Sequence, residues 1–362
     1  MLQSYSNIFV ILSDLARMVE EEIPYNSKEK DIIKWESTYH NSLKQLLKDM
    51  ELEEKSSDQA KNFEGLIYNM YHSFYKYAKI DFTKEYIDGV LKHIIEERHQ
   101  VEQRTEKWYE DMKTMLTASE FSKLFGSERL RGQLVLSKVN PEKRDNLKAV
   151  TTEFMSPMDW GIRFEPVVKK HLEKIWNCQI YECGRMKHPT EHLGASPDGL
   201  ITTEGPKYGR LVEIKCPYSR KVGNGIPEDY WVQMQIQLEV TNLYECEYFE
   251  VEILSKTPKN LNPEFSNIDG EVYLLYKDNV YSYHYDNIIP EGYDLIEKIP
   301  YAITKVHNEL VLRDKQWYEN TLAKQHAFWE DVEKARKGEF ILAEPRTKKA
   351  KANNECLIID NE

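Results

Sequence analysis

The stretch 194–217, GASPDGLITTEGPKYGRLVEIKCP, places two acids and an amine on what otherwise resembles a buried hairpin. Asp198 sits in a Pro-Asp-Gly bend, and Glu213 and Lys215 follow on a short apolar segment. An unpaired charge buried in such a hairpin costs several kcal/mol. The chain therefore needs a fold that solvates these groups or gives them a partner.

Strand geometry predicts how these charges are arranged. Residues two apart in a β-strand point to the same face, so Glu213 and Lys215 project together, whereas Val212, Ile214 and Cys216 point to the opposite, apolar side. Pro and Gly favour a tight bend in SPDG. Pairing of GLIT with RLVEIK across the turn between them brings the bend beside the second strand. Two carboxylates and an amine are thus expected to converge.

This convergence suits a divalent cation. Neighbouring carboxylates repel each other, and hard oxygen ligands without thiolates suit Mg²⁺ or Mn²⁺. Glu165, in GIRFEP on the preceding helix, is a third candidate acid. An E-x-K triplet alone is typical of a solvated surface hairpin. The helical acid, the bend and the flanking apolar residues together favour a site.

The segments around this stretch predict an α/β fold. Residues 1–100 show helical spacing and predict an all-helical N-terminal domain. Later segments alternate in type, and the order predicts a mixed central β-sheet flanked by helices over residues 101–342. The expected elements are two helices over 103–126, a helix over 156–176, three strands within 178–218, a helix over 227–243 and a strand over 246–254.

The C-terminal third predicts a hairpin and a long helix. Residues 271–287 alternate around an Asp-Asn turn. Residues 293–340 are predicted to be amphipathic and helical, with Pro300 kinking or starting a helix. Residues 343–362 are predicted to be a disordered tail with a basic cluster, which a nuclear-import signal or plain solvation would explain.

Composition predicts an intracellular, soluble protein, in host cytoplasm or nucleus if the source is viral. No run of 18 apolar residues occurs, and five sparse cysteines argue against a disulfide framework. The net charge of −12 is unevenly spread: residues 101–240 carry +1, against −5 before and −8 after them. Cys178, Cys183, His188 and His192 superficially resemble zinc-ligand spacing, but opposite strand parity separates the two sulfurs.

The motif GASPDGL…LVEIKCP resembles the core of the PD-(D/E)XK nuclease superfamily, and specifically its lambda-exonuclease-like, YqaJ-type viral recombinase family. Three further stretches agree in order and spacing: RTEKWYEDMKTMLTAS, WGIRFEP and YWVQMQIQLEV. The resemblance is strong over about residues 103–250, extends weakly to about 340, and does not include residues 1–100.

The resemblance implies roles for individual residues. Asp198, Glu213 and the Ile214 carbonyl would hold the metal ions, with help from Glu165. Lys215 would position the attacking water, and Gln233 would support the catalytic centre. Gln237 shares a helical face with Gln233 and is a second candidate, with a solvated amide as the alternative.

The 5′-phosphate of a DNA end would contact Ser119 and Ser196 by the same resemblance. The family's phosphate-binding Arg, however, falls on Met112. Lys113 and Arg104 are candidate substitutes, although a helix rotates about 100° per residue, so Lys113 points in another direction.

The implied function is Mg²⁺-dependent exonuclease activity on ends of linear double-stranded DNA, with 5′→3′ polarity, in recombination or end processing. The family precedent is a homotrimer with a basic channel, and a single-strand annealing recombinase is a candidate partner. Two alternatives remain: an endonuclease or RNA-degrading nuclease on the same core, and a non-catalytic module that binds a recombination partner.

Overall fold

The computed structural model describes residues 84–98, 100–102, 105–140 and 149–344. The chain divides into two compact units, Met1–Lys84 and Glu85–Glu362, and the description below concerns the second. Most of the predicted helical domain 1–100, and all but two residues of the predicted tail, lie outside the described residues. No helix in the described ranges is long and apolar enough to cross a membrane.

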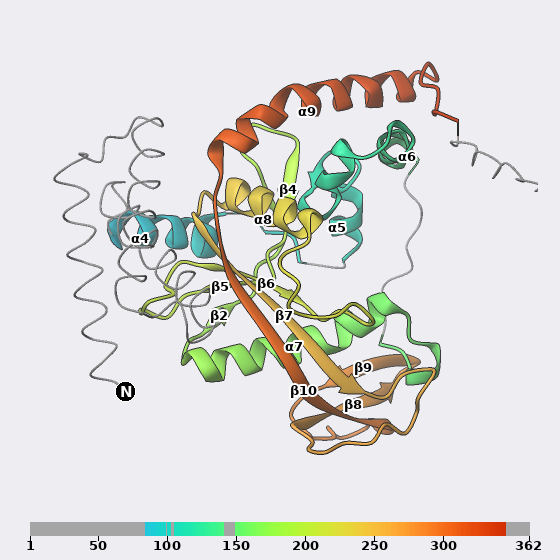
Figure 1. Ribbon diagram of the computed structural model, residues 1–362. Helices are drawn as coiled ribbons and strands as arrows, with labels where there is room; N and C mark the ends of the chain where they lie inside the picture. Colours follow the sequence, from blue (N-terminus) through green and yellow to red (C-terminus); the bar gives the residue numbers. More distant parts are fainter. Residues whose placement is uncertain (1–83, 99, 103–104, 141–148, 345–362) are drawn as a thin grey trace, which may run out of the picture. The chain divides into compact units, whose positions relative to one another are not determined.

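A mixed sheet forms the centre of the described unit (Figure 1). Its neighbouring strands are antiparallel except β6 and β7, which run parallel. Parallel neighbours require a crossover connection, and helix α8 (Glu228–Thr241) supplies it. The spatial order within the described residues is β2 (Ile180–Tyr181), β5 (Gly199–Ile201), β6 (Leu211–Lys215), β7 (Glu245–Ser255), β10 (Asp294–Leu312), β8 (Gly270–Lys277) and β9 (Val280–His284).

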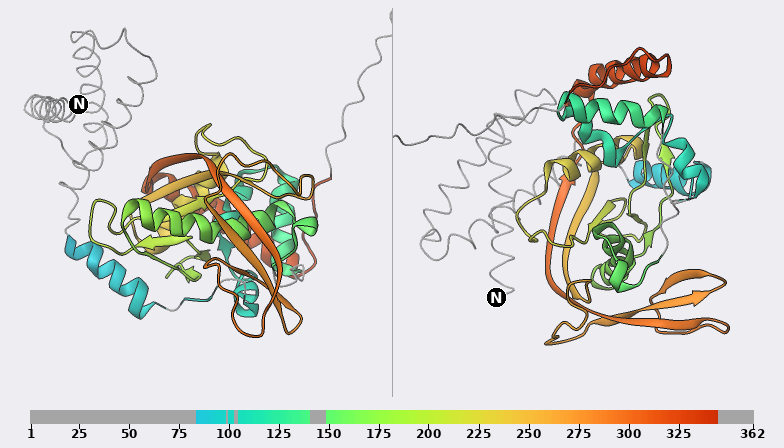
Figure 2. Two further views of the ribbon diagram at one scale, coloured as in Figure 1. Left: turned by 90° about the horizontal axis from the view of Figure 1, so that it is seen from below. Right: turned by 90° about the vertical axis from the view of Figure 1, so that its right-hand side faces the viewer.

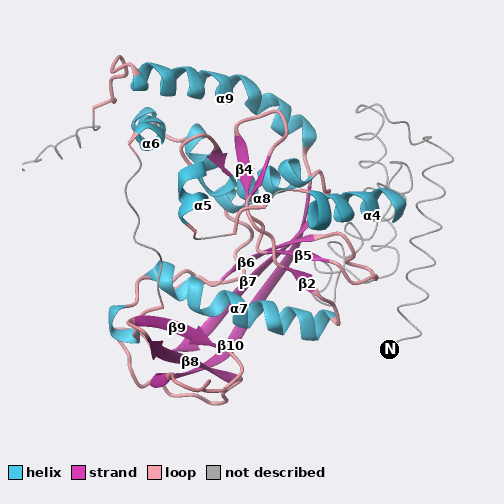
Figure 3. Cartoon of the chain, turned by 180° about the vertical axis from the view of Figure 1, so that it is seen from behind, coloured by secondary structure: helices cyan, strands magenta, loops and turns pink. Residues whose placement is uncertain are grey.

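Helices cover both faces of this sheet, as the sequence predicted. Helix α7 (Pro157–Trp176) lies along one face and α8 lies on the other side of β6 (Figure 3). Alternation along β6 divides its side chains between two cores. Leu211 packs in the core that contains α8, whereas Val212 and Ile214 pack in the core that contains α7. The predicted apolar face of β6 is therefore confirmed.

A second, three-stranded sheet lies on the α8 side. Its order is β1 (Leu116–Thr117), β4 (Leu193–Ala195) and β3 (Met186–Lys187), with β1 and β4 parallel. The helical segments on this side are α4 (Lys84–Lys92), η1 (His93–Glu97), α5 (Glu106–Asp111), η2 (Ala118–Phe125), α6 (Glu128–Val139) and α9 (Lys315–Arg336). The short segment η3 (Thr152–Phe154) lies instead next to α7, where Arg163 donates a hydrogen bond to Thr152.

The predicted helix over 156–176 forms because its ends are capped. Ser156 and Asp159 form a capping box, and Pro157 occupies the first turn, where its missing N–H costs nothing. Asn177 ends the helix in the left-handed conformation at φ 48°. The predicted hairpin is also present: Asp278 and Asn279 both adopt positive φ in the turn between β8 and β9.

The predicted helix over 293–340 is wrong in its first half. Residues Asp294–Leu312 form strand β10, which pairs with β7 and β8 and runs the length of the sheet (Figure 2). Many of its residues are β-branched or aromatic, which favours a pleated, half-buried surface. Pro300 lies inside this strand opposite Glu271, and its carbonyl accepts a hydrogen bond from Ser255 at 2.6 Å. The helical half of the prediction begins at Lys315.

The segment before residue 101 contributes to the second unit. Leu91 and Ile94 are buried in the core on the α8 side. Tyr208 donates a hydrogen bond to Asp88 at 2.7 Å, which ties α4 to the turn between β5 and β6. The compact unit consequently begins at Glu85, before the boundary that sequence spacing suggested.

Candidate active site

The Pro-Asp-Gly bend places Asp198 beside the middle of β6. Gly199 pairs with Val212 in the antiparallel β5–β6 ladder, and the Asp198 carboxylate accepts a hydrogen bond from the Ile214 N–H at 2.8 Å. A side chain on Gly199 would place its Cβ 2.1 Å from Cγ2 of Ile180 on β2. The glycine of the bend is therefore needed for close strand approach as well as for the turn.

Glu213 is the most enclosed group of the site. Its side chain has 0% relative exposure, against 20% for Lys215, and the two form an ion pair. Gln233 donates its side-chain amide to Oε1 of Glu213 at 2.7 Å, and Gln237 donates to Oε2 at 2.6 Å. Both carboxylate oxygens thus have hydrogen-bond donors, which a buried charge requires.

The geometry of helix α8 explains why these two glutamines both contact Glu213. Gln233 and Gln237 are four residues apart and share the helical face that looks onto β6. Gln235 lies on another side of the helix, where it donates to the Leu312 carbonyl at 2.8 Å and accepts from the Asp314 N–H at 2.7 Å. The structure therefore places Gln237 at the site on equal terms with Gln233, and its reading as a solvated amide is wrong because its side chain is buried.

Charge interactions link the acids and the amine. Burial and the negative charges of Glu213 and Glu165 raise the pKa of Asp198 well above its usual value. Burial opposes protonation of Lys215, but Glu213 and Asp198 outweigh it and raise the pKa of the amine. The Lys215 ammonium also lies 4.8 Å from the centre of the Tyr230 ring, an arrangement that further favours the cation.

The oxygen donors at this point have the chemistry of a magnesium site. Asp198 and Glu213 are carboxylates, and the Ile214 carbonyl belongs to the same strand. No three His, Cys, Asp or Glu side chains gather as a metal-binding group among the described residues, so Glu165 does not complete such a group by itself. Magnesium keeps several water ligands and binds through one or two carboxylates. The Asp198 and Glu213 pair fits that ion.

The predicted phosphate contacts come together on the small sheet. Thr117 pairs with Gly194 in the parallel β1–β4 ladder; Ser119 follows β1 in the first turn of η2, and Ser196 directly follows β4. Ser196 accepts a hydrogen bond from Nε1 of Trp108 at 3.4 Å, and Ser119 lies 3.4 Å from the hydroxyl of Thr117. The two serines therefore follow the carboxyl ends of two neighbouring strands.

The cation candidates for this phosphate are less well placed. Lys113 is exposed beyond the end of α5, and Arg104 lies outside the described residues. Two buried cations that the sequence did not reveal contact the segment 108–112 instead. Lys138 donates to the Met112 carbonyl at 3.0 Å and to Glu120 at 2.8 Å, and Arg185 stacks on the Trp108 ring at 3.8 Å. Neither has a spacing signal, because each comes from a distant part of the chain.

The zinc-like cysteines and histidines have other roles. Cys183 is buried, and burial raises the pKa of its thiol to about 12. His188 accepts at Nδ1 from the Glu191 N–H at 2.9 Å, and His192 donates from Nδ1 to the Thr114 carbonyl at 3.1 Å. The first hydrogen bond stabilises the turn between β3 and β4, and the second joins this turn to Thr114.

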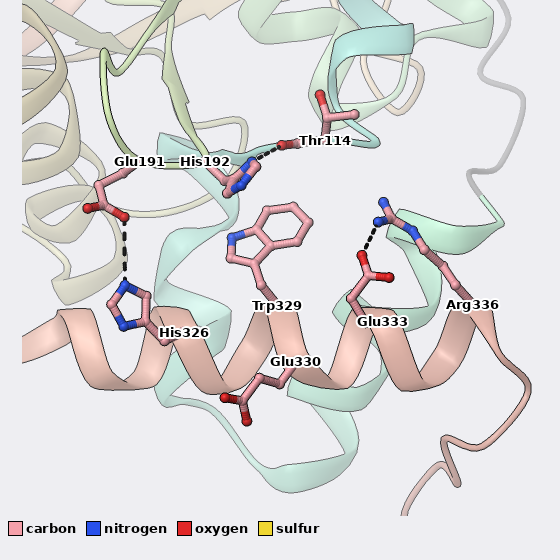
Figure 4. A pocket seen from close by; sticks show the side chains of 8 residues that line it. All are labelled: Thr114, Glu191, His192, His326, Trp329, Glu330, Glu333 and Arg336. Atoms are coloured by element: carbon pink, nitrogen blue, oxygen red, sulfur yellow. Dashed lines mark hydrogen bonds and ion pairs between the residues drawn. The ribbon is translucent and has the colours of Figure 1, made fainter.

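A surface pocket of about 480 Å³ lies elsewhere, between α9 and this turn (Figure 4). None of the predicted site residues lines it. His192 packs against the ring of Trp329 there at 5.0 Å, and Arg336 pairs with Glu333. Its lining residues are Thr114, Glu191, His192, His326, Trp329, Glu330, Glu333 and Arg336.

The sequence over residues 107–244 matches the YqaJ-like viral recombinase domain. The match covers less than half of the chain. The YqaJ-like domain runs from the start of α5 to the end of α8. It contains every described residue of the predicted site, including Asp198, Glu213, Lys215 and both glutamines. Strands β7 to β10 and helix α9 follow it in the chain.

Sequence similarity to a known protein extends beyond the YqaJ-like domain. The chain is 23% identical over 301 residues to the uncharacterized protein R354 of Acanthamoeba polyphaga mimivirus, in an alignment that covers 66% of this chain and 54% of the relative. The chain thus spans about half the length of that relative.

Solved structures with some similarity include two exonucleases. An alkaline exonuclease from Laribacter hongkongensis aligns with TM-score 0.42 and 20% identity, covering 65% of this chain and 95% of that chain. A phage-related exonuclease from Haemophilus somnus 129PT aligns with TM-score 0.39 and 11% identity, covering 62% and 96%.

Proposed function

We propose that this protein is a metal-dependent deoxyribonuclease that hydrolyses phosphodiester bonds from the ends of linear double-stranded DNA, with 5′→3′ polarity. The observation that carries the proposal is the convergence of Asp198, Glu213 and Lys215 at β6, with two glutamines of α8 fixing the buried acid. A structural ion pair needs neither the second carboxylate nor the two amides. The match to the YqaJ-like domain supports the reading.

Asp198, Glu213 and the Ile214 carbonyl would hold Mg²⁺ or Mn²⁺, with Glu165 contributing from α7. The bound ion supplies a polarised water and neutralises charge on the phosphate. The chain supplies the rest. Lys215 donates hydrogen bonds to the attacking water or to the phosphorane oxygens, where negative charge develops. Gln233 and Gln237 hold the Glu213 carboxylate in one orientation, which keeps its oxygens directed at the site.

The preference for a DNA end would come from Ser119 and Ser196. Their hydroxyls can donate to a terminal 5′-phosphate, and the Trp108 indole fixes one of them. A binding pocket for the terminal phosphate next to the hydrolytic site would set the polarity of degradation, because it holds the 5′ end at the scissile bond.

Linear duplexes labelled at the 5′ or the 3′ end test this function directly. With Mg²⁺, we expect immediate release of labelled mononucleotide from the 5′ label and late release from the 3′ label. Lys215→Ala and Asp198→Ala should each abolish release, as should EDTA. Lys334→Ala, which removes an exposed lysine of α9, is the matched control and should cut normally.

The same assay separates the alternatives. Cutting of a circular duplex or of a structured RNA, with linear ends spared, would replace the exonuclease by an endonuclease or an RNA-degrading enzyme. Full activity of Lys215→Ala would overturn the assignment of the site. Binding of DNA with no hydrolysis under any divalent cation would favour the non-catalytic module.

A further inference from the structure

The loop between β6 and α8 carries positive charge and no negative charge. Its sequence over residues 216–227 is CPYSRKVGNGIP, with Arg220 and Lys221 and no acid, in a chain of net charge −12. The loop joins the strand that bears Glu213 and Lys215 to the helix that bears Gln233 and Gln237. Any charge fixed in this loop is therefore close to the candidate site.

Arg220 is held in place by a buried acid. Glu250 on β7 has 0% exposure and pairs with the guanidinium of Arg220, whose side chain is 35% exposed. In the parallel β6–β7 ladder, Glu250 is the register partner of Lys215. Glu250 also lies outside the YqaJ-like segment, so the family match does not account for it.

The loop around Arg220 is fixed at two further points. The Gly223 N–H donates to Oε2 of Glu250 at 3.2 Å, and Lys305 donates to the Val222 carbonyl at 2.6 Å. Gly223 adopts φ 87°, a left-handed conformation that favours glycine. The backbone of the loop is thus hydrogen-bonded to β7 through the Gly223 N–H and to β10 through the carbonyl of the buried Val222.

Arg220 and the candidate catalytic ammonium both lie near the ring of Tyr230. The guanidinium carbon is 5.5 Å from the centre of the Tyr230 ring, and the Lys215 ammonium is 4.8 Å from the same point. Arg220 has five N–H donors, and Glu250 cannot accept from all of them because it has two oxygens, one of which also accepts from the Gly223 N–H. Donors remain for an anion that approaches from the open side.

We propose that Arg220 binds a backbone phosphate of the DNA substrate next to the scissile bond, and that Glu250 is the positioning residue that aims its guanidinium. The inference rests on the proposed function and assigns a substrate contact to that same site. A purely structural ion pair would have both partners enclosed, whereas here the acid is fully buried and the cation is open on one side. Planar bidentate contacts to phosphate also favour Arg over Lys at such a position.

The salt dependence of DNA affinity tests the proposal, because it depends on the number of phosphate contacts. Anisotropy of a labelled duplex is measured without divalent cation, in the Asp198→Ala background, at a series of salt concentrations. Each phosphate contact contributes about −0.9 to the slope of log K against log salt. Arg220→Met should weaken binding about tenfold, as expected for one lost charge-assisted hydrogen bond, and should make the slope less negative by about one contact.

The partner variants identify the role of Glu250. Glu250→Gln should weaken binding by a smaller factor, and it should add nothing in the Arg220→Met background, since the acid acts through Arg220. Arg220→Lys should restore the slope but not the full affinity. The double variant Arg220→Met/Glu250→Gln leaves no unpaired buried charge, so it remains readable if Arg220→Met alone fails to fold. Arg131→Ala, which removes another carboxylate-paired arginine, is the matched control.

An unchanged slope in the folded double variant would overturn the proposal, as would an equal loss from Arg131→Ala. Steady-state kinetics of the otherwise native chain give a second readout: KM should rise for Arg220→Met with kcat little changed. If the native protein does not cut DNA, the proposed function fails while the binding slopes still report on Arg220. If it cuts and the slopes do not move, only the present inference fails.

Discussion

Gln237 of α8 donates its amide to Oε2 of Glu213 at 2.6 Å, and both side chains have 0% exposure. The contact joins a helix to the centre of the sheet through a buried charge. Its enclosure means that no solvent replaces the amide if it is removed.

Gln237→Ala should lower both stability and activity. The change leaves a buried carboxylate oxygen without its donor, which costs about 1–3 kcal/mol. Urea unfolding measures that loss, and kcat of the folded fraction should fall because Glu213 is no longer held in one orientation.

Gln235→Ala is the control for this prediction. It removes a glutamine of the same helix that bonds only the Leu312 carbonyl and the Asp314 N–H. Stability should fall while kcat of the folded protein stays unchanged. Equal kcat losses in the two variants would show that general loosening of α8, and not the Glu213 contact, affects turnover.

Gly199→Ala should destabilise the sheet through a steric clash. The new methyl group would lie 2.1 Å from Cγ2 of Ile180, and overpacking of this kind costs about 1–3 kcal/mol. In an Ile180→Ala background the same Gly199→Ala change should cost less stability, because the clashing atom is absent. Thermal unfolding measures both variants.

Gly161→Ala provides the opposite case. This glycine lies inside α7 with nothing within 4 Å of an added Cβ. The substitution should stabilise the protein by up to about 1 kcal/mol through helix propensity. Destabilisation at Gly161 of the size expected at Gly199 would contradict the steric explanation.

Lowering the pH should reduce the free energy of unfolding, in part because Glu247 on β7 becomes protonated. Burial opposes ionisation there, but Lys207, a hydrogen bond from Asn308 and Arg210 outweigh it and hold the pKa of Glu247 below its usual range. A carboxyl with a lower pKa in the folded chain binds fewer protons when folded. Its contribution is therefore present above the usual pKa of 4.5 and is lost as the pH falls through the folded value.

The free energy of unfolding of Glu247→Gln, measured from pH 7 to pH 3, checks this assignment. The variant should be less stable at pH 7 and should lose less stability below about pH 4.5 than the native protein. Glu264→Gln, at an exposed position, should follow the native curve. A native curve that stays parallel to that of Glu247→Gln throughout would rule out the role of this group.

Met112→Arg should increase the preference for a 5′-phosphate. Met112 occupies the position at which the family resemblance places a phosphate-binding arginine, on the turn that Lys138 holds by its carbonyl. An arginine there adds paired N–H donors near Ser119 and Ser196. The ratio of cutting rates on 5′-phosphorylated and 5′-hydroxyl duplexes should rise about tenfold, with Met112→Gln as the uncharged control. A ratio that is already high in the native protein would show that another cation serves the phosphate.

The sequence predicted the central part of the site because its signals are local. The bend at Asp198, the parity of Glu213 and Lys215, and the helical spacing of Gln233 and Gln237 each depend on residues a few positions apart. The contacts of Lys138, Arg185 and Glu250 could not be predicted in that way, since each partner lies on a segment far along the chain.

Strand β10 was missed for a different reason. Residues 294–312 carry charged and apolar residues in a mixture that also fits a helical stripe, and Pro300 suggested a helix start. Pairing along almost all of β7 decides the outcome, because tertiary contacts override weak local preference.

The parallel pairing of β6 and β7 through α8 has a kinetic consequence. The stretch 198–250 contains the acids, the ammonium, both glutamines, Arg220 and Glu250, so most contacts of the candidate site join residues near in sequence. Closing these loops costs less chain entropy than closing the longer loop between β7 and the far end of β10. The candidate-site elements β6, α8 and β7 should therefore assemble before the long strand β10 pairs with β7. Their amides should gain hydrogen-exchange protection first during refolding.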